Sequence, residues 1–175
     1  MAVKFEGFAK VVDRSALRPG RWVVAQVARS AALCFATAQG EGASRVMLTF
    51  RPTGIDEIRF APMVLAEIGG TLTSVEDELV FAPGGGAQPL GLLAPTRRPF
   101  PSGALLRLSS GDLGIGYAGP GLDELNLVSL ASGEPAKGFD LVFERWSLSL
   151  RRGGTESYLG RFRHGETRGD LRHMR

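Results

Sequence analysis

Residues 145–163 read RWSLSLRRGGTESYLGRFR, two strand-like runs separated by a pair of glycines. A Gly-Gly pair suits the two-residue turn of a β-hairpin, because the favoured turn types need a positive φ at their central residues. If Gly153 and Gly154 form the turn, Arg151 lies opposite Glu156, and facing opposite charges stabilise an antiparallel pair. The segment therefore predicts a hairpin. Because an isolated hairpin is only marginally stable, we expect the rest of the chain to supply strands against which it packs.

The same register predicts the rest of the hairpin. It gives three further cross-strand pairs, namely Leu148 with Leu159, Trp146 with Arg161, and Glu144 with Arg163. The expected core-facing side chains are Trp146, Leu148, Leu150 and Leu159. The expected solvent-facing side chains are Ser147, Ser149, Arg151, Glu156 and Tyr158. A cation–π contact is expected between Trp146 and Arg161. Upstream, apolar residues occupy odd positions in 139–143 and even positions in 146–150, a change of phase that predicts a β-bulge near Glu144–Arg145.

The remaining sequence consists of short apolar runs punctuated by 24 Gly and 10 Pro. No amphipathic helical pattern lasts beyond about ten residues, and turn signals recur about every ten residues, as is typical of a sandwich or barrel. We therefore expect an all-β fold, a β-sandwich or partly open β-barrel of about 10–12 short antiparallel strands. The predicted strands are Val3–Val12, Arg21–Ala28, Ala32–Ala38, Arg45–Arg51, Glu57–Phe60, Met63–Ile68, Glu78–Ala82, Ala104–Ser109, Leu113–Tyr117, Leu125–Leu130, Phe139–Leu150 and Thr155–Arg163.

The organisation predicted is one β domain over residues 1–163, followed by a short, polar, flexible tail at 164–175. Two short helical turns are expected, at Ser15–Arg18 and at Ser74–Glu78. The proline-rich segment Pro83–Pro101 predicts a long surface connection.

Composition narrows the class of protein. A chain of 175 residues with 43% hydrophobic residues can bury a core without staples, and its single cysteine, Cys34, excludes an internal disulfide. The first residues lack the apolar run of a signal peptide, and no stretch is apolar enough to span a membrane as a helix. We expect a cytoplasmic protein, or one within an assembled particle.

No pattern of catalytic or cofactor-binding residues stands out. Gly114, Gly116 and Gly119 have the spacing of a dinucleotide fingerprint, but Pro120 follows where the motif needs a helix. Cys34 lies between apolar neighbours, so a buried structural thiol is expected rather than a nucleophile. We therefore expect no cofactor, and the sequence favours a non-enzymatic role while leaving catalysis by dispersed residues open.

Metal binding is also not favoured. The acidic clusters Asp56-Glu57, Glu76-Asp77-Glu78 and Asp123-Glu124 lack the spacing of a calcium loop, and adjacent acids on loops are expected to face solvent. One grouping of metal-ligand types occurs in the tail, made up of His164, Glu166, Asp170 and His173. Because zinc sites need convergent ligands on ordered backbone, we expect no metal there.

Charge is the most informative functional signal. Residues 145–175 carry 8 Arg and 3 acids, whereas the preceding 144 residues carry 13 Lys or Arg and 15 acids. A basic segment on a near-neutral body favours an acidic partner. The candidate partner-binding residues are Arg97, Arg98, Arg145, Arg152 and Arg161.

Three functions follow as hypotheses. The first is a non-catalytic binding or assembly module that acts through protein–protein contacts or self-association, as a component of a larger bacterial or virion-like assembly. The second is a small-molecule or carbohydrate-binding β domain, which could be an enzyme, with Trp22 and acidic residues lining a concave site. The third is nucleic-acid binding through the C-terminal arginines, for which a basic groove with interleaved aromatics would be needed.

Overall fold

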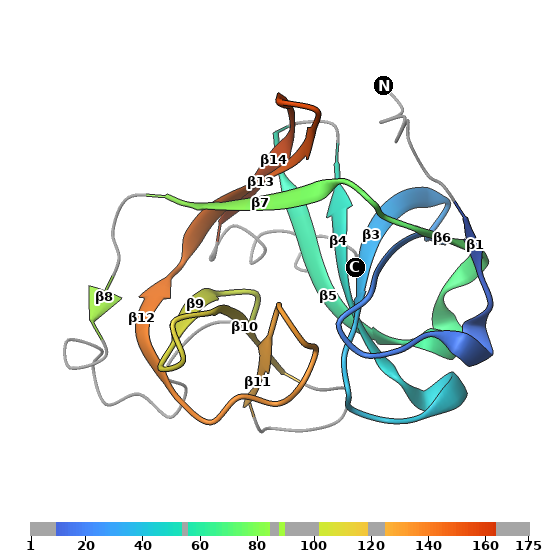
Figure 1. Ribbon diagram of the computed structural model, residues 1–175, viewed down its shortest axis with the longest axis horizontal. Coiled ribbons are helices and arrows are strands. Elements are labelled where there is room, and N and C mark those ends of the chain that lie inside the picture. The colour runs from blue at the N-terminus through green and yellow to red at the C-terminus, as the bar shows by residue number, and fades with distance from the viewer. Residues whose placement is uncertain (1–9, 54–55, 85–87, 90–101, 119–124, 164–175) are drawn as a thin grey trace, which may run out of the picture.

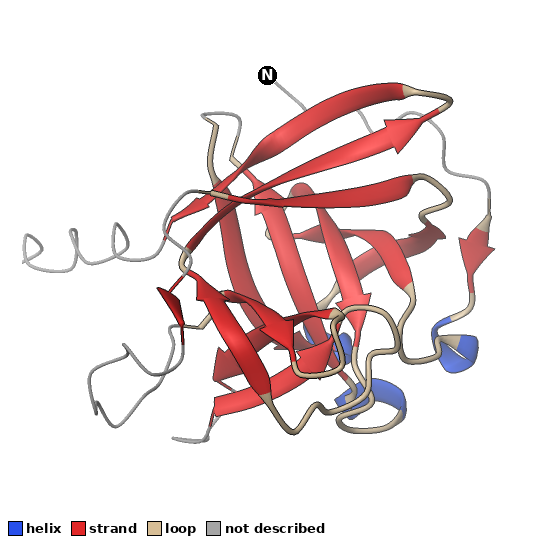
Figure 2. Ribbon diagram, turned by 60° about the vertical axis from the view of Figure 1, so that its left-hand side comes forward, coloured by secondary structure: helices blue, strands red, loops and turns tan. Residues whose placement is uncertain are grey.

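The computed structural model describes residues 10–53, 56–84, 88–89, 102–118 and 125–163. Within them the chain is nearly all β, with fourteen strands in three antiparallel sheets and three short 3-10 helices (Figure 1). The three sheets contribute to one shared core and do not close into a barrel (Figure 2). The predicted all-β, sandwich-like fold class is confirmed.

The sheets differ in size. The first has six strands in the order β1 (Val11–Val12), β6 (Gly69–Ser74), β2 (Trp22–Val27), β3 (Ser30–Ala36), β4 (Val46–Pro52) and β5 (Ile58–Val64). The second has five, in the order β11 (Leu125–Ser129), β10 (Leu113–Ala118), β9 (Leu105–Leu108), β12 (Phe139–Phe143) and β8 (Gln88–Pro89). The third contains the hairpin, in the order β14 (Thr155–Arg163), β13 (Arg145–Arg152) and β7 (Glu78–Pro83). The 3-10 helices are η1 (Arg14–Ala16), η2 (Gly42–Ser44) and η3 (Leu65–Glu67).

Most predicted strands that fall on described residues are found. Of the strand expected at Val3–Val12, residues 3–9 lie outside the described residues and Val11–Val12 form β1. The expected strand Phe139–Leu150 is two strands, β12 and β13, and the segment 57–78 needs three corrections. The two strands expected over 57–68 are one strand, β5, followed by η3. The helical turn expected at Ser74–Glu78 is wrong, because β6 ends at Ser74 and β7 begins at Glu78. Strand β6 itself was missed, since its sequence GGTLTS begins with two glycines, which are poor strand formers. The turn expected at Ser15–Arg18 is confirmed as η1, one residue earlier.

Strand β3 lies at the centre of the packing because both of its faces are buried. Leu33 and Phe35 belong to the main core between the sheets. Cys34 and its neighbours Ala32 and Ala36 belong to a second core on the opposite face, which Leu17, Leu65, Ile68 and Leu72 cover. Burial on both faces explains why this strand is a continuous apolar run without alternation.

Trp146 connects the three sheets. Its side chain, which lies on β13, is 1% exposed, and its indole Nε1 donates a 2.9 Å hydrogen bond to the carbonyl oxygen of Gly103, just before β9. Its ring lies edge-on to Phe50 of the six-stranded sheet and stacks on Phe162 of β14, with centroids 5.2 Å apart. A buried aromatic with a satisfied polar atom of this kind fixes how neighbouring layers sit against one another.

The bulge predicted near Glu144–Arg145 is a change of sheet instead. Strand β12 ends at Phe143 in the five-stranded sheet, Glu144 forms a bend, and β13 begins at Arg145 in the three-stranded sheet. Figure 1 shows β12 and β13 following one another across this bend. The odd-to-even change of apolar positions therefore marks the point at which the chain leaves one layer for another.

The hairpin has the predicted register only near its turn. Arg152 pairs with Thr155 and Arg151 with Glu156, as expected, but the register shifts between Leu148 and Ser149. Beyond the shift the pairs are Leu148 with Gly160, Ser147 with Arg161, Trp146 with Phe162, and Arg145 with Arg163. The three pairs predicted there are thus wrong by one residue, because Leu159 is an extra residue on β14. Ser149, expected in solvent, is 5% exposed.

Candidate functional site

Near the turn, the hairpin arginines are held by acids from the hairpin and from the segment at β7. The guanidinium of Arg151 lies between the carboxylates of Glu78 on β7, at 3.2 Å, and Glu156 on β14, at 3.3 Å. Hydrogen bonds from Ser149 and Arg151 lower the pKa of Glu156 from its ordinary value. Arg152 pairs with Asp77 at 2.8 Å. These contacts tie the three strands of the sheet together, so two of the arginines contribute to the structure.

At the other end of β14, Arg161 makes exposed contacts. Its Nε lies 3.2 Å from a carboxylate oxygen of Asp56 and donates a 3.1 Å hydrogen bond to the hydroxyl of Tyr158. The Arg161 and Asp56 side chains are 52% and 49% exposed, and Tyr158 is 50% exposed. Partial desolvation and the neighbouring Asp56 raise the pKa of Tyr158 from its ordinary value.

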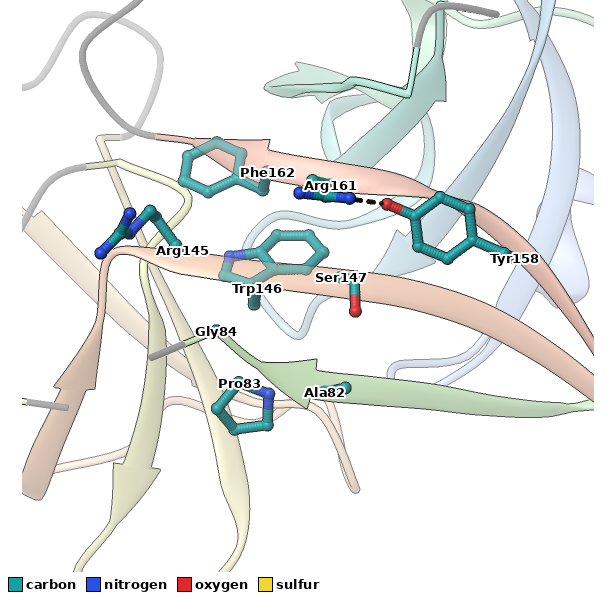
Figure 3. Close-up of a pocket in the computed structure, with 9 residues that line it drawn as sticks. All are labelled: Ala82, Pro83, Gly84, Arg145, Trp146, Ser147, Tyr158, Arg161 and Phe162. Atoms are coloured by element: carbon teal, nitrogen blue, oxygen red, sulfur yellow. Dashed lines mark hydrogen bonds between the residues drawn. The ribbon is translucent and has the colours of Figure 1, made fainter. Parts of the chain in front are cut away.

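A depression of about 530 Å³ lies beside this group. The stacked rings of Trp146 and Phe162 contribute to its wall, and Arg145 and Arg161 approach it from adjacent strands (Figure 3). Its full lining is Ala82, Pro83, Gly84, Arg145, Trp146, Ser147, Tyr158, Arg161 and Phe162. We call it the hairpin depression. Guanidinium groups, a phenol and aromatic rings around one hollow can bind a carboxylate or phosphate attached to an apolar or planar group.

The outer edge of β14 continues from the depression. Among the described strands, β14 pairs with β13 alone, apart from a bridge between Glu57 and Arg161 near its far end. Residues 155–158 are exposed. An edge strand presents unpaired backbone donors and acceptors, to which an extended segment of another chain can add.

The structure separates the five candidate arginines. It brings Arg145 and Arg161 together at the hairpin depression, and places Arg152 near the turn beside Asp77. Arg97 and Arg98 lie outside the described residues, as does nearly all of the predicted Pro83–Pro101 connection.

The sequence did not reveal Tyr158 as a site residue or Asp56, Asp77 and Glu78 as ion partners of the arginines. These acids were expected to face solvent. Asp77 lies 75 residues before Arg152, and Glu78 lies 73 residues before Arg151. No local sequence pattern indicates contacts at such separations.

The other candidate chemistries find no support in the described residues. Cys34 is buried, and desolvation raises the pKa of its thiol to about 12, so the expected structural thiol is confirmed and the thiolate nucleophile is disfavoured. Gly114 and Gly116 lie in β10, which pairs with the next described strand, β11, in antiparallel fashion. No group of three or more potential metal ligands gathers in the described ranges, and the tail set from His164 to His173 lies outside them.

Described residues also line two smaller cavities away from the hairpin. One, of about 440 Å³, lies where η1 and the following loop approach β2 and the end of β6. The other, of about 350 Å³, is a groove lined by Trp22, Val75, Asp77, Leu79, Phe81, Asp112, Leu113, Leu130 and Ala131. Its lining includes Trp22 and the acidic residues Asp77 and Asp112, and the second functional hypothesis expects Trp22 and acidic residues at a concave site.

Over the residues described, the structure has no helix long and apolar enough to cross a membrane. Comparison with known proteins adds no relative: no protein-family model matches the chain, and neither the curated proteins nor the solved structures give a significant match.

Proposed function

We propose that this protein is a non-catalytic binding domain that acts through protein–protein contacts, and that its contact surface is the C-terminal hairpin. The surface combines the hairpin depression with the exposed edge of β14 at residues 155–158. The observation that carries the proposal is that Arg145 and Arg161, from neighbouring strands, line one hollow together with the exposed phenol of Tyr158.

The charge of this surface favours an acidic protein segment as the partner. The ion pair between Arg161 and Asp56 is exposed on both sides, and such a pair contributes only about 0–1 kcal/mol. A partner's carboxylate can therefore replace or join Asp56 at little cost. Arginine binds carboxylates through two parallel hydrogen bonds, which adds geometric selectivity to the charge attraction. Tyr158 supplies an amphipathic side chain of the type enriched at interfaces.

The backbone supports the same partner in an extended conformation. A strand added along β14 would satisfy the edge donors and acceptors by main-chain hydrogen bonds, while an acidic side chain reached the arginines. Membership of a larger bacterial or virion-like assembly, in the cytoplasm or within a particle, is a further prediction of this proposal.

The test begins with native mass spectrometry of the protein isolated from its source cells, to detect a bound partner or a second copy. The wild-type chain is then compared with an Arg145→Gln/Arg161→Gln variant for capture of that partner. The control, Arg29→Gln/Arg107→Gln, removes the same charge from exposed positions outside the hairpin. We expect the hairpin variant to lose at least tenfold in affinity and the control to keep it. The proposal is contradicted if the protein isolated from its source cells is monomeric and carries no partner.

A second candidate, a small-molecule or carbohydrate-binding domain, is favoured by the groove that holds Trp22, Asp77 and Asp112. Aromatic and acidic side chains around one hollow suit a polyhydroxylated ligand. Titration with a panel of oligosaccharides, followed by tryptophan fluorescence, tests it. We expect Asp112→Asn to weaken any binding that this groove supports, and the absence of any response in the wild-type chain removes this candidate.

Nucleic-acid binding, the third hypothesis, remains a prediction. Its support is weaker because Arg151 and Arg152 are ion-paired within the chain. Salt-dependent binding of DNA or RNA that is lost in the Arg145→Gln/Arg161→Gln variant would favour it over the protein partner.

A further inference from the structure

The cavity of about 440 Å³ is chemically different from the hairpin surface and shares no residue with it. It lies between the segment 12–23 and the end of β6, on the first sheet. Its lining is Val12, Ala16, Leu17, Arg18, Gly20, Arg21, Trp22, Val23, Ser74 and Val75. Two of these residues carry a positive charge and none carries a negative charge.

The two arginines of this cavity contrast with their neighbour Arg14. The Arg14 guanidinium donates to the carbonyl oxygens of Leu65, Ile68 and Gly70, at 3.1, 2.6 and 2.9 Å, so it ties η1 to the segment after β5. Arg18 and Arg21 are exposed, and within the described ranges their side chains make no hydrogen bond or ion pair. Arg18 and Arg21 thus line one hollow that has no carboxylate in its lining, which leaves both guanidinium groups available to a bound anion.

A third polar group in the lining lacks a partner. The Ser74 hydroxyl is shielded from solvent and has no hydrogen-bond partner in the described part of the chain. A buried donor left unpaired is unfavourable, and most buried hydroxyls in native proteins have a partner. Ser74 lines the cavity, so a small shift of the side chains that cover its hydroxyl would let it donate to an acceptor bound there.

We propose that this cavity is a binding site for a small amphipathic anion, an organic molecule with a carboxylate or phosphate head and a short aliphatic body. Arg18 and Arg21 bind the head, and Ser74 donates a hydrogen bond to it. The aliphatic body lies against apolar side chains of the lining, such as Leu17 and Val75. The volume is within the range of small-molecule pockets, and apolar walls with few polar groups are typical of them.

Calorimetric titration of the full chain tests the proposal with four probes: hexyl phosphate, hexanoate, hexanol and inorganic phosphate. We expect at least one of the two six-carbon anions to bind at least tenfold more tightly than hexanol, which lacks the charge, and than inorganic phosphate, which lacks the apolar body. Binding of hexyl phosphate alone assigns the site to phosphate monoesters, and binding of hexanoate alone assigns it to carboxylates.

Variants locate the binding. Arg18→Gln/Arg21→Gln is expected to lose at least tenfold in affinity for the anion, Ser74→Ala to lose severalfold, and the control Arg59→Gln/Arg107→Gln to bind as wild type. The altered arginines are exposed, and an unchanged thermal melting curve shows that each variant is folded. Failure of both anions to bind up to about 5 mM overturns the proposal. Equal binding of hexanol, or binding unaffected by Arg18→Gln/Arg21→Gln, also overturns it, and unchanged binding by Ser74→Ala removes the hydroxyl from the site.

Discussion

The two halves of the C-terminal hairpin obey different rules. In the half next to the turn, residues 149–158, every cross-strand pair follows from Gly153 and Gly154. In the far half, the register is shifted by one residue at Leu159. Apart from the buried Ser149, the near half is exposed or half-buried, whereas the far half places Trp146, Leu148 and Phe162 in the main core.

The difference shows which force sets a register. Close to a tight turn, the turn geometry allows a single register of the two strands, and exposed ion pairs add only a small stabilisation to it. Farther away, burial of large side chains dominates. Without the extra residue, Trp146 would face Arg161; with it, Trp146 faces Phe162 and stacks on it. The shift turns Phe162 into the core, where it is 7% exposed, and leaves Arg161 outside.

Removal of Trp146 is the strongest test of the far half. Trp146→Ala deletes a fully buried ring and its hydrogen bond to Gly103, so we expect a loss of about 3–5 kcal/mol in the free energy of unfolding. Leu150→Ala, in the half-buried near half, should cost about 1 kcal/mol. Urea unfolding measures the loss in both variants. Equal losses would contradict the claim that burial of large side chains matters more in the far half than in the near half.

The next largest loss of stability is expected from a substitution at Gly160. Its φ of +146° is rarely adopted by L-residues, and an added Cβ would meet Ile58 Cγ1 at 3.1 Å. We therefore expect Gly160→Ala to destabilise the fold by about 1–3 kcal/mol, measured by the same unfolding method. A neutral result would show that the shift at Leu159 can form without this backbone conformation.

The turn itself should be less sensitive. Gly153 and Gly154 have φ values of 53° and 85°, and an added Cβ at either one meets no atom within 4 Å. Gly154→Ala is expected to cost about 1 kcal/mol through backbone strain alone. Gly153→Asn should be close to neutral, because asparagine tolerates the left-handed region. A larger loss for Gly153→Asn, seen as a lower melting temperature, would contradict this account of the turn.

The smallest effect concerns the ion pairs beside the turn. The native pKa of Glu156 is lowered, so its contribution to stability is present at neutral pH and is lost as pH falls below its ordinary value of 4.5 toward the native one. Ser149→Ala and Arg151→Gln remove its two hydrogen-bond donors and should each raise that pKa. Carboxyl-carbon NMR titration measures the shift. An unchanged titration midpoint in both variants would show that Ser149 and Arg151 do not lower the pKa of Glu156.

The same contrast explains how much of the candidate site could be predicted. Arg145 and Arg161 were identified from charge alone, because clustered arginines are visible in the sequence. Their meeting with Tyr158 at one depression depends on the shifted register and could not be predicted from the turn. Strand β6, which supplies Ser74 to the second cavity, was missed because its weak local preference is overcome by pairing with β1 and β2.

By itself, the sequence determined the all-β class, most of the strands, the hairpin turn with its nearest pairs, and the burial of Cys34. These features depend on apolar patterning and turn chemistry, which act over a few residues. Tertiary structure alone decided the shift at Leu159, the change of sheet at Glu144, the contacts of the hairpin arginines with Asp56, Asp77 and Glu78, and the cavities. Each of these depends on packing between segments far apart in the chain, where the burial of large side chains outweighs local preference.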